Sequence, residues 1–325
     1  MTSAQQTTET AGTTGTTEDT KSLAPQDFGS RLRAALDEQG PLCVGIDPHP
    51  RLLSQWGLPV TVSGLDQFAQ TCVEALAGRV AVVKPQSAFF ERFGSEGVAV
   101  LERTLAAFRG SGTLSLLDVK RGDIGSTMEA YAIAYLSDES RLRADAITVS
   151  PFLGYGSLRP ALDLARSTGR GIFVLALTSN PDGPSVQHAD RAGRSVSGAI
   201  VDAVTLENAN HEANANHEAN PKGANSAGSP GTSRLGSVGL VVGATIGDAV
   251  QRLGIDLAAS RAPLLAPGFG AQGASAEDLR TVFGAALPNV IASSSRAVLA
   301  AGPDVRALSE AARRAADEVS VLLTA

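Results

Sequence analysis

The chain has 325 residues, a length that fits either two average domains or one large α/β barrel. Its 33 acidic residues outnumber its 27 basic ones, and the net charge of −6 leaves no basic field to hold a nucleic acid or to dock on an anionic membrane. Hydrophobic residues make up 43% of the chain, but its longest apolar runs are far shorter than the ~20 residues of a membrane span. We therefore expect a soluble protein with neither a nucleic-acid nor a membrane partner.

The beginning of the chain differs in composition from the rest. Residues 1–24 are rich in threonine and nearly free of large apolar side chains, so we expect a disordered tail. The tail lacks the apolar stretch of a secretory signal, and its acidic residues argue against a transit peptide. Cys43 and Cys72 lie in apolar segments and are expected to be buried, reduced thiols. Together these features favour a cytoplasmic location.

After the tail, eight short apolar runs alternate with longer amphipathic stretches. Runs that are hydrophobic along their whole length are typical of parallel strands covered on both faces. The expected strands are Leu42–Asp47, Val80–Gln86, Leu114–Lys120, Ala146–Ser150, Gly171–Thr178, Val238–Thr245, Pro263–Gly268 and Asn289–Arg296. The expected helices include Val98–Phe108, Ser126–Tyr135 and Ala276–Ala286, the last opened by Ser275 and Asp278 in the pattern of a capping box. Eight such units predict a single-domain TIM (β/α)8 barrel over residues 25–325.

One segment, at about residues 207–235, does not fit this alternation. It contains the sequence Asn-His-Glu-Ala-Asn twice, with His211 and His217, and continues into Gly, Ser and Pro. The two histidines are too far apart for the H-E-x-x-H metal motif. We therefore expect a low-complexity insertion on the surface rather than a metal site.

Charged side chains fall at the ends of the expected strands. Asp47 ends the first strand, Lys84 lies near the end of the second, Asp118 and Lys120 end the third, and Arg296 ends the last. In a barrel of this kind these ends form the mouth where chemistry occurs. Asp118 and Lys120 are two residues apart, so a regular strand would place both on one face. The pattern favours a working site, although a buried ion-pair network that only closes the barrel would give the same pattern.

Residues 118–127 read D-V-K-R-G-D-I-G-S-T. This segment resembles the D-x-K-R-G-D-I-G-x-T form of the signature of the orotidine 5′-phosphate decarboxylase family, as in its type 2 subfamily. Other segments resemble family elements in the same order: Leu42–Pro48 the first strand, Val83–Gln86 the second, Leu177–Pro181 the fifth, Ala266–Gly273 the phosphate-gripper loop, and Ser295 with Arg296 the phosphate-binding end of the eighth.

The resemblance implies a carboxy-lyase that converts orotidine 5′-monophosphate to uridine 5′-monophosphate (UMP) and CO2 without a cofactor or metal, the last step of de novo UMP biosynthesis. Asp118 would repel the carboxylate of the substrate, and Lys120 would stabilise and protonate the carbanion-like C6. Lys84 and Asp123 would complete an alternating array that keeps these charges ionised and oriented.

The resemblance also implies which residues bind the rest of the nucleotide. Asp47 and Lys84 match residues that contact the ribose. Ser179 matches a residue that contacts the pyrimidine, and Pro267 matches one that lines the base pocket. Gln272 matches a residue that bridges phosphate and base, and Ser295 and Arg296 match the phosphate site. Ser295 stands where many relatives have glycine. Asp123, Ile124 and Thr127 match residues that reach the active site of the partner subunit, with Asp123 and Thr127 serving the second ribose hydroxyl, so a homodimer is expected.

Three alternatives need separate treatment. Residues 268–273 satisfy the dinucleotide fingerprint G-x-G-x-x-G, but they follow the seventh strand rather than the first, so a monophosphate site fits better. A Mg²⁺-dependent keto-sugar-phosphate decarboxylase or synthase of the same superfamily would need another carboxylate on the second strand, where this chain has Lys84. A non-catalytic nucleotide-binding barrel would have no need of the intact Asp–Lys–Asp array.

Overall fold

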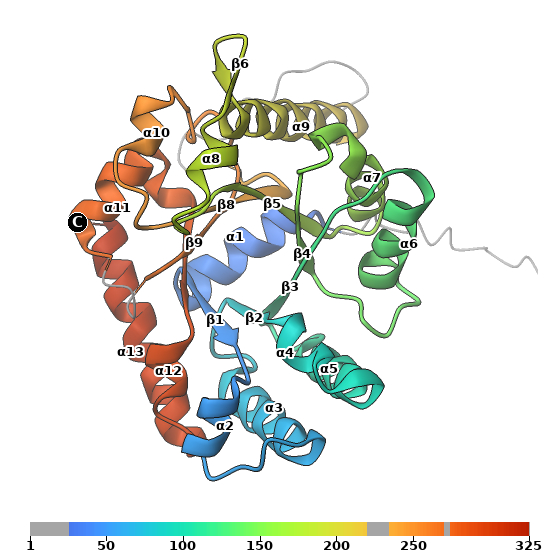
Figure 1. Cartoon of the computed structure of the whole chain (residues 1–325), viewed down its shortest axis with the longest axis vertical. Coiled ribbons are helices and arrows are strands. Elements are labelled where there is room, and N and C mark those ends of the chain that lie inside the picture. Colours follow the sequence, from blue (N-terminus) through green and yellow to red (C-terminus); the bar gives the residue numbers. More distant parts are fainter. Residues whose placement is uncertain (1–25, 220–233, 270–273, 325) are drawn as a thin grey trace, which may run out of the picture.

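The computed structural model describes residues 26–219, 234–269 and 274–324. Within them, eight parallel strands close into a barrel in the order β1-β10-β9-β8-β5-β4-β3-β2, as Figure 1 shows from near the barrel axis. The barrel strands are β1 (Leu42–Ile46), β2 (Val82–Pro85), β3 (Leu114–Arg121), β4 (Ala146–Val149), β5 (Gly171–Leu177), β8 (Val238–Val242), β9 (Leu264–Pro267) and β10 (Val290–Ser294). The predicted (β/α)8 barrel is confirmed, and each expected strand is present.

Helices surround the barrel. The longer ones are α1 (Phe28–Gln39), α3 (Val62–Leu76), α5 (Gly94–Phe108), α6 (Gly125–Leu136), α7 (Arg159–Ser167), α9 (Val196–Ala219), α11 (Ala276–Phe283) and α13 (Val305–Thr324). Short helices are α2 (Pro50–Gln55), α4 (Ser87–Glu91), η1 (Tyr155–Leu158), α8 (Pro184–Gln187), α10 (Ala249–Arg252), η2 (Gly284–Asn289) and α12 (Arg296–Leu299), and a hairpin is formed by β6 (Asp190–Arg191) and β7 (Arg194–Ser195). The predicted capping box of α11 is confirmed, because Ser275 and Asp278 each bond the backbone N–H of the other.

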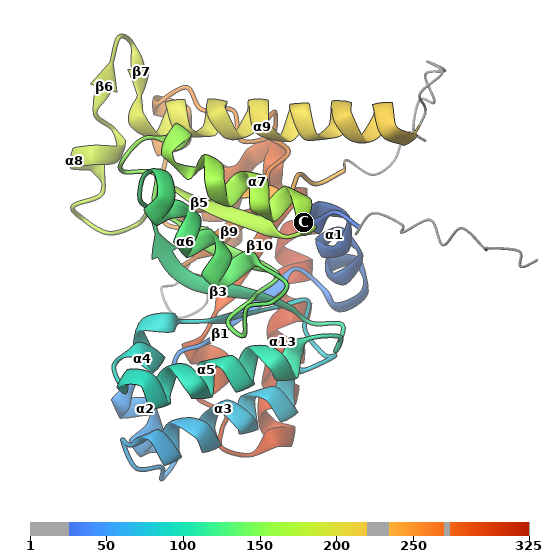
Figure 2. The ribbon, with the colours of Figure 1, turned by 90° about the vertical axis from the view of Figure 1, so that its right-hand side faces the viewer.

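One end of the barrel is closed by α1. The Phe28 ring packs edge-on against Phe173 with centroids 6.1 Å apart, and it occupies the space that a β-carbon on Gly171 would need. Figure 2 shows α1 at one end of the barrel and α8 with the β6–β7 hairpin at the other. The carboxyl ends of the strands, opposite α1, are therefore where a substrate can enter. None of the helices in the described ranges has the length and apolar character that a bilayer crossing requires.

The two cysteines are free and fully buried, as predicted. Burial raises the pKa of the Cys43 thiol to about 12, which leaves it protonated and unreactive at neutral pH.

The segment expected as a surface insertion, at about residues 207–235, begins and ends inside the fold. Glu207 is buried against Arg159 and Arg166, and the Asn208 amide bonds the backbone of Val238 on both its N–H and its C=O. Leu235 is only 2% exposed. The expected limits are therefore too wide: Glu207 and Asn208 are polar, but their hydrogen-bonding groups are satisfied in the interior. α9 continues to Ala219, and residues 220–233, like the tail, lie outside the described residues.

Candidate active site

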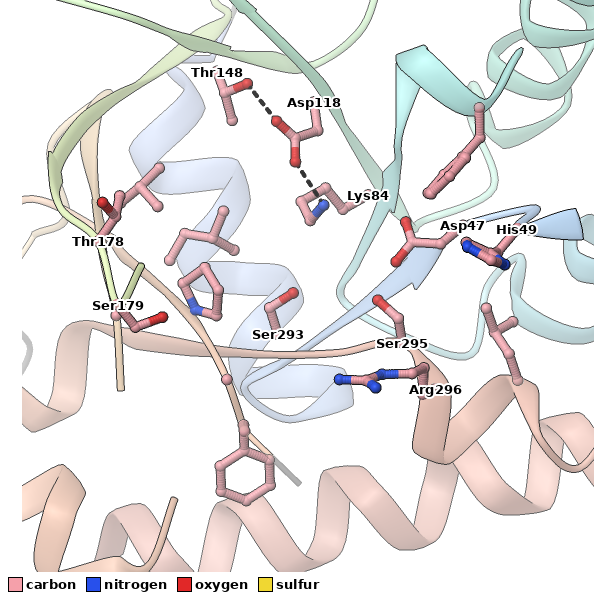
Figure 3. A pocket seen from close by; sticks show the side chains of 18 of the residues that line it. Asp47, His49, Lys84, Asp118, Thr148, Thr178, Ser179, Ser293, Ser295 and Arg296 are labelled. Carbon is pink, nitrogen blue, oxygen red and sulfur yellow. Dashed lines mark hydrogen bonds and ion pairs between the residues drawn. The ribbon is translucent and has the colours of Figure 1, made fainter. Parts of the chain in front are cut away.

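A cavity of about 870 Å³ opens at the carboxyl ends of the barrel strands. Figure 3 shows polar side chains from several strands converging in it. The predicted site residues that line it are Asp47, Lys84, Asp118, Lys120, Ser179, Pro267, Ser295 and Arg296. The structure thus brings together residues that are up to 249 positions apart in the sequence, as the strand-end pattern predicted.

A buried ion cluster lies at the centre of this cavity. Lys84 Nζ is 2.8 Å from Asp118 Oδ2, and Lys120 Nζ is 2.6 Å from Asp118 Oδ1. The side chains of Lys84 and Asp118 are 9% and 8% exposed, while that of Lys120 is 47% exposed. One carboxylate therefore holds two ammonium groups, one sealed in the barrel and one open to the cavity.

The charges of this cluster stabilise one another. Burial alone would raise the pKa of the Asp118 carboxyl, but Lys84 and Lys120 hold it down at about 2. Burial opposes the charged form of Lys84, but Asp118 and Asp47 outweigh this effect and raise the pKa of its ammonium above the ordinary value. Asp118 and Lys84 are consequently both ionised at neutral pH, which places a negative and a positive charge at fixed positions in a partly desolvated site.

The end of β3 is not a regular strand, contrary to the expectation that alternation places Asp118 and Lys120 on one face. The pairing of β3 with β4 shifts register between Leu117 and Arg121, and Lys120 has a left-handed backbone with φ of +45°. The two side chains do meet, but they meet across this irregular turn. Regular alternation therefore does not describe how these two side chains come together.

One side of the cavity combines charge with small side chains. Asp47 Oδ1 is buried without a hydrogen-bond partner among the described residues, and Ser295 packs over Gly45 next to it. In Figure 3 the Arg296 guanidinium extends into the cavity beside Ser295. A ligand with hydroxyl groups and an anionic group would satisfy this side of the cavity.

The opposite side carries the loop after β5. Gln187 of α8 accepts the backbone N–H of Thr178 at 2.9 Å and donates to Thr178 Oγ1 at 2.5 Å. Thr178 Oγ1 lies 2.6 Å from Asn180 Oδ1, so the turn that presents Ser179 is fixed from outside the cavity. The wall beneath is apolar and consists of Leu175, Val241, Leu265 and Pro267. A flat, weakly polar ring would fit between this wall and the Ser179 loop.

Three predicted site residues, Asp123, Ile124 and Thr127, do not line the cavity in this chain. Asp123 bonds the backbone N–H of Ile124 at 2.8 Å, and Ile124 and Thr127 are exposed at the start of α6. Gln272 lies outside the described residues.

Sequence reasoning missed Thr148 and Gln187. Thr148 lines the cavity as the only polar residue of β4, and this isolated hydroxyl near the end of an apolar strand was the signal that could have identified it. Gln187 gave no such signal, because the sequence around it shows no recognisable pattern.

His49, two residues after Asp47, lies at the edge of the cavity. It caps α2 by accepting the Arg51 N–H and packs edge-on against Phe89 at the cavity edge. Both contacts are structural.

Fold and site together define an enzyme of the (β/α)8-barrel class, with a charged reaction centre at the carboxyl ends of the strands. The particular family follows from comparison with known proteins. A family model described as "Orotidine 5'-phosphate decarboxylase / HUMPS family" matches residues 40–311, and the chain belongs to this family.

Close relatives carry the first of these two names. The chain is 58% identical over 300 residues to the orotidine 5′-phosphate decarboxylase of Salinispora arenicola, covering 92% of this chain and 99% of the relative. It is 56% identical to that of Streptomyces coelicolor over 302 residues, with 92% and 99% coverage.

Solved structures agree with this assignment. A Streptomyces avermitilis crystal structure, provisionally named orotidine 5′-phosphate decarboxylase, superposes with a TM-score of 0.82 and 54% identity, covering 93% of this chain and 98% of that one. The orotidine monophosphate decarboxylase of Leishmania donovani gives a TM-score of 0.67 and 28% identity, covering 92% and 100%.

Proposed function

We infer that the chain is an orotidine 5′-phosphate decarboxylase, which converts orotidine 5′-monophosphate to UMP and CO2 in pyrimidine biosynthesis. The observation that carries this inference is the Lys84–Asp118–Lys120 cluster at the barrel mouth, in a chain 56–58% identical to enzymes of that name. The Mg²⁺-dependent reading is not favoured, because the second strand offers the ammonium of Lys84 where a metal site would need a carboxylate.

For the reaction itself we assign the central roles to Asp118 and Lys120. The bond between C6 of the pyrimidine and its carboxyl carbon breaks, CO2 leaves, and the electron pair remains on C6. Lys120 Nζ, the exposed ammonium of the cluster, donates the proton that C6 receives and is reprotonated from solvent. Asp118, held ionised with its pKa at about 2, places a negative charge where the substrate carboxylate must sit.

Lys84 has a different task in this proposal. Its ammonium is almost fully buried and bonds Asp118 Oδ2, so it keeps the carboxylate charged and fixed rather than contacting C6. The positive charges also stabilise negative charge developing at C6 in a partly desolvated site.

The rest of the nucleotide would lie across the cavity. We propose that Asp47 and Lys84 bind the ribose, that Ser179 contacts the pyrimidine above Pro267, and that Arg296 with the Ser295 backbone holds the phosphate. Gln272, which we assign to bridge phosphate and base, belongs to the same proposal. No step in this scheme uses a cofactor or a metal ion.

We also propose that the active enzyme is a homodimer, located in the cytoplasm. Asp123, Ile124 and Thr127 would enter the active site of the partner subunit. Support comes from the surface after β3 and β4, where Ile124, Phe152 and Leu153 are 61%, 79% and 52% exposed. Gly122 packs on the Ser150 carbonyl, so the two loops that carry these apolar side chains lie side by side and form an uncovered patch.

The test is ultraviolet absorbance of orotidine 5′-monophosphate incubated with the purified protein and excess EDTA. Conversion to UMP under these conditions is expected. If conversion occurs only with Mg²⁺, or only with a keto-sugar phosphate as substrate, the proposal is wrong. Tight binding of a nucleotide monophosphate without turnover would identify a non-catalytic barrel.

A further inference from the structure

The pairing of β3 with β4 is irregular at Lys120. The register shifts between Leu117 and Arg121, and the regular pairing of the two strands is interrupted over the residues between them. A buried backbone N–H without a partner is costly, and a left-handed backbone at a lysine is strained. Another group must therefore satisfy the Lys120 N–H and hold the turn in place.

The Thr148 side chain supplies that group. Its hydroxyl oxygen accepts the Lys120 N–H at 2.9 Å. The same hydroxyl donates its proton to Asp118 Oδ1 at 2.8 Å. A hydroxyl has one proton to donate, so these two bonds fix its orientation. Thr148 is 1% exposed, so its side chain is shielded from bulk solvent.

Asp118 Oδ1 also receives the Lys120 ammonium at 2.6 Å. Thr148 is therefore linked to Lys120 in two ways. It bonds the Lys120 backbone N–H directly, and it shares the Asp118 Oδ1 atom with the Lys120 ammonium. A rotation of Asp118 or a relaxation of the Lys120 turn would break one of the two Thr148 bonds. Figure 3 shows Thr148 and Lys84 on opposite sides of the Asp118 carboxylate.

We propose that Thr148 is a positioning residue for decarboxylation, whose hydroxyl holds the Lys120 turn and the Asp118 carboxylate in their reactive arrangement. This inference rests on the roles proposed above for Asp118 and Lys120. It assigns Thr148 no contact with substrate: its effect is on the chemical step, since its hydroxyl bonds the two residues assigned to that step, Lys120 and Asp118.

The experiment compares Thr148→Val with Thr148→Ser. Valine keeps the shape of threonine and removes the hydroxyl, and serine keeps the hydroxyl. The valine variant should lose about tenfold to a hundredfold in kcat, the effect of one hydrogen bond to a charged group, with the Kd for UMP changed less than about threefold. The serine variant should recover most of this loss.

Thr113→Val is the matched control. Thr113 is 2% exposed, and its hydroxyl accepts the Gly78 N–H at 2.9 Å and donates to the Val80 carbonyl at 2.8 Å. Valine at this position likewise removes a buried hydroxyl that accepts a backbone N–H and donates its proton, here to backbone carbonyls, but just before β3, at the closed end of the barrel. We expect a lower Tm with kcat retained.

The inference is overturned if Thr148→Val keeps kcat within about threefold of the native enzyme, or if Thr148→Ser loses as much as Thr148→Val. If valine prevents folding, Thr148→Ala and Thr148→Ser, which differ only in the hydroxyl, provide the same comparison. Lys120→Ala, assayed in parallel, separates the two proposals: if that variant stays active, the proposed function itself fails.

Discussion

The Ser295 hydroxyl lies over the α-carbon of Gly45, so closely that a β-carbon on Gly45 would stand 1.9 Å from Ser295 Oγ. The same β-carbon would be 3.1 Å from Asp47 Oδ2. One backbone position on β1 therefore controls the placement of a phosphate-side residue and a ribose-side residue together.

Gly45→Ala should consequently displace Ser295 and weaken the whole phosphate and ribose end of the site. We expect a loss of about 1–3 kcal/mol in unfolding free energy, as for other overpacked interiors, together with weaker UMP binding. The double variant Gly45→Ala, Ser295→Gly should recover stability, because the colliding hydroxyl is gone. Urea unfolding measures the stability, and UMP titration measures the binding. If the double variant loses as much stability as the two single variants together, the proposed clash between residues 45 and 295 is wrong.

Lys120→Ala should abolish decarboxylation while the barrel stays folded. The Lys120 side chain is 47% exposed, and its removal leaves the buried Lys84–Asp118 pair intact. Loss of a proton donor lowers rates by about a hundredfold to ten-thousandfold, with stabilisation of charge adding to this. Absorbance assays measure the rate and circular dichroism checks the fold.

Lys84→Ala is the contrasting case for stability. It leaves the Asp118 carboxylate buried without its most enclosed partner, so unfolding free energy should fall by several kcal/mol, about 3–5 where no other group compensates. Equal stability of the two alanine variants would mean that the burial difference between the lysines has no energetic consequence.

Mixing inactive Lys120→Ala with inactive Asp123→Ala should regenerate activity if the site is shared. Each heterodimer would then contain one site with a native Lys120 and a native Asp123, and random exchange should restore about a quarter of the native rate. Differently tagged subunits show whether exchange has occurred. Confirmed exchange without activity would place Asp123 in the site of its own subunit or outside any site.

How far the sequence predicts this molecule depends on the range of the interactions involved. The eight strands follow from local hydrophobicity, and the meeting of Asp118, Lys84 and Arg296 follows from topology, because barrel strands end at one rim. The left-handed backbone at Lys120 could not be predicted, since its N–H bonds a side chain of the neighbouring strand, that of Thr148, and local sequence does not show such a contact. Glu207 looked solvated because its arginine partners are distant in sequence.

The charge on Asp118 makes stability depend on pH. Its folded-state pKa of about 2 lies below the ordinary 3.8, so the folded state gains about 2 kcal/mol above pH 4, and this gain is lost as pH falls from about 4 to about 2. Asp118→Asn should remove this component from the acid dependence of urea unfolding. The variant is expected to be less stable at neutral pH, where Lys84 stays buried without a carboxylate, and the difference from the native protein should narrow in acid. A constant difference at all pH values would argue against the depressed pKa.

Gln187 provides the last prediction, because it fixes the Ser179 turn without reaching the cavity itself. Gln187→Leu removes both bonds to Thr178, so the turn gains freedom that binding must then remove. UMP affinity should fall about tenfold, whereas ribose 5-phosphate, which has no base to contact Ser179, should bind as before. Gln187→Glu keeps an acceptor for the Thr178 N–H and should lose less. Isothermal titration with both ligands measures the difference, and equal weakening of both would mean that Gln187 supports the whole cavity rather than its base side.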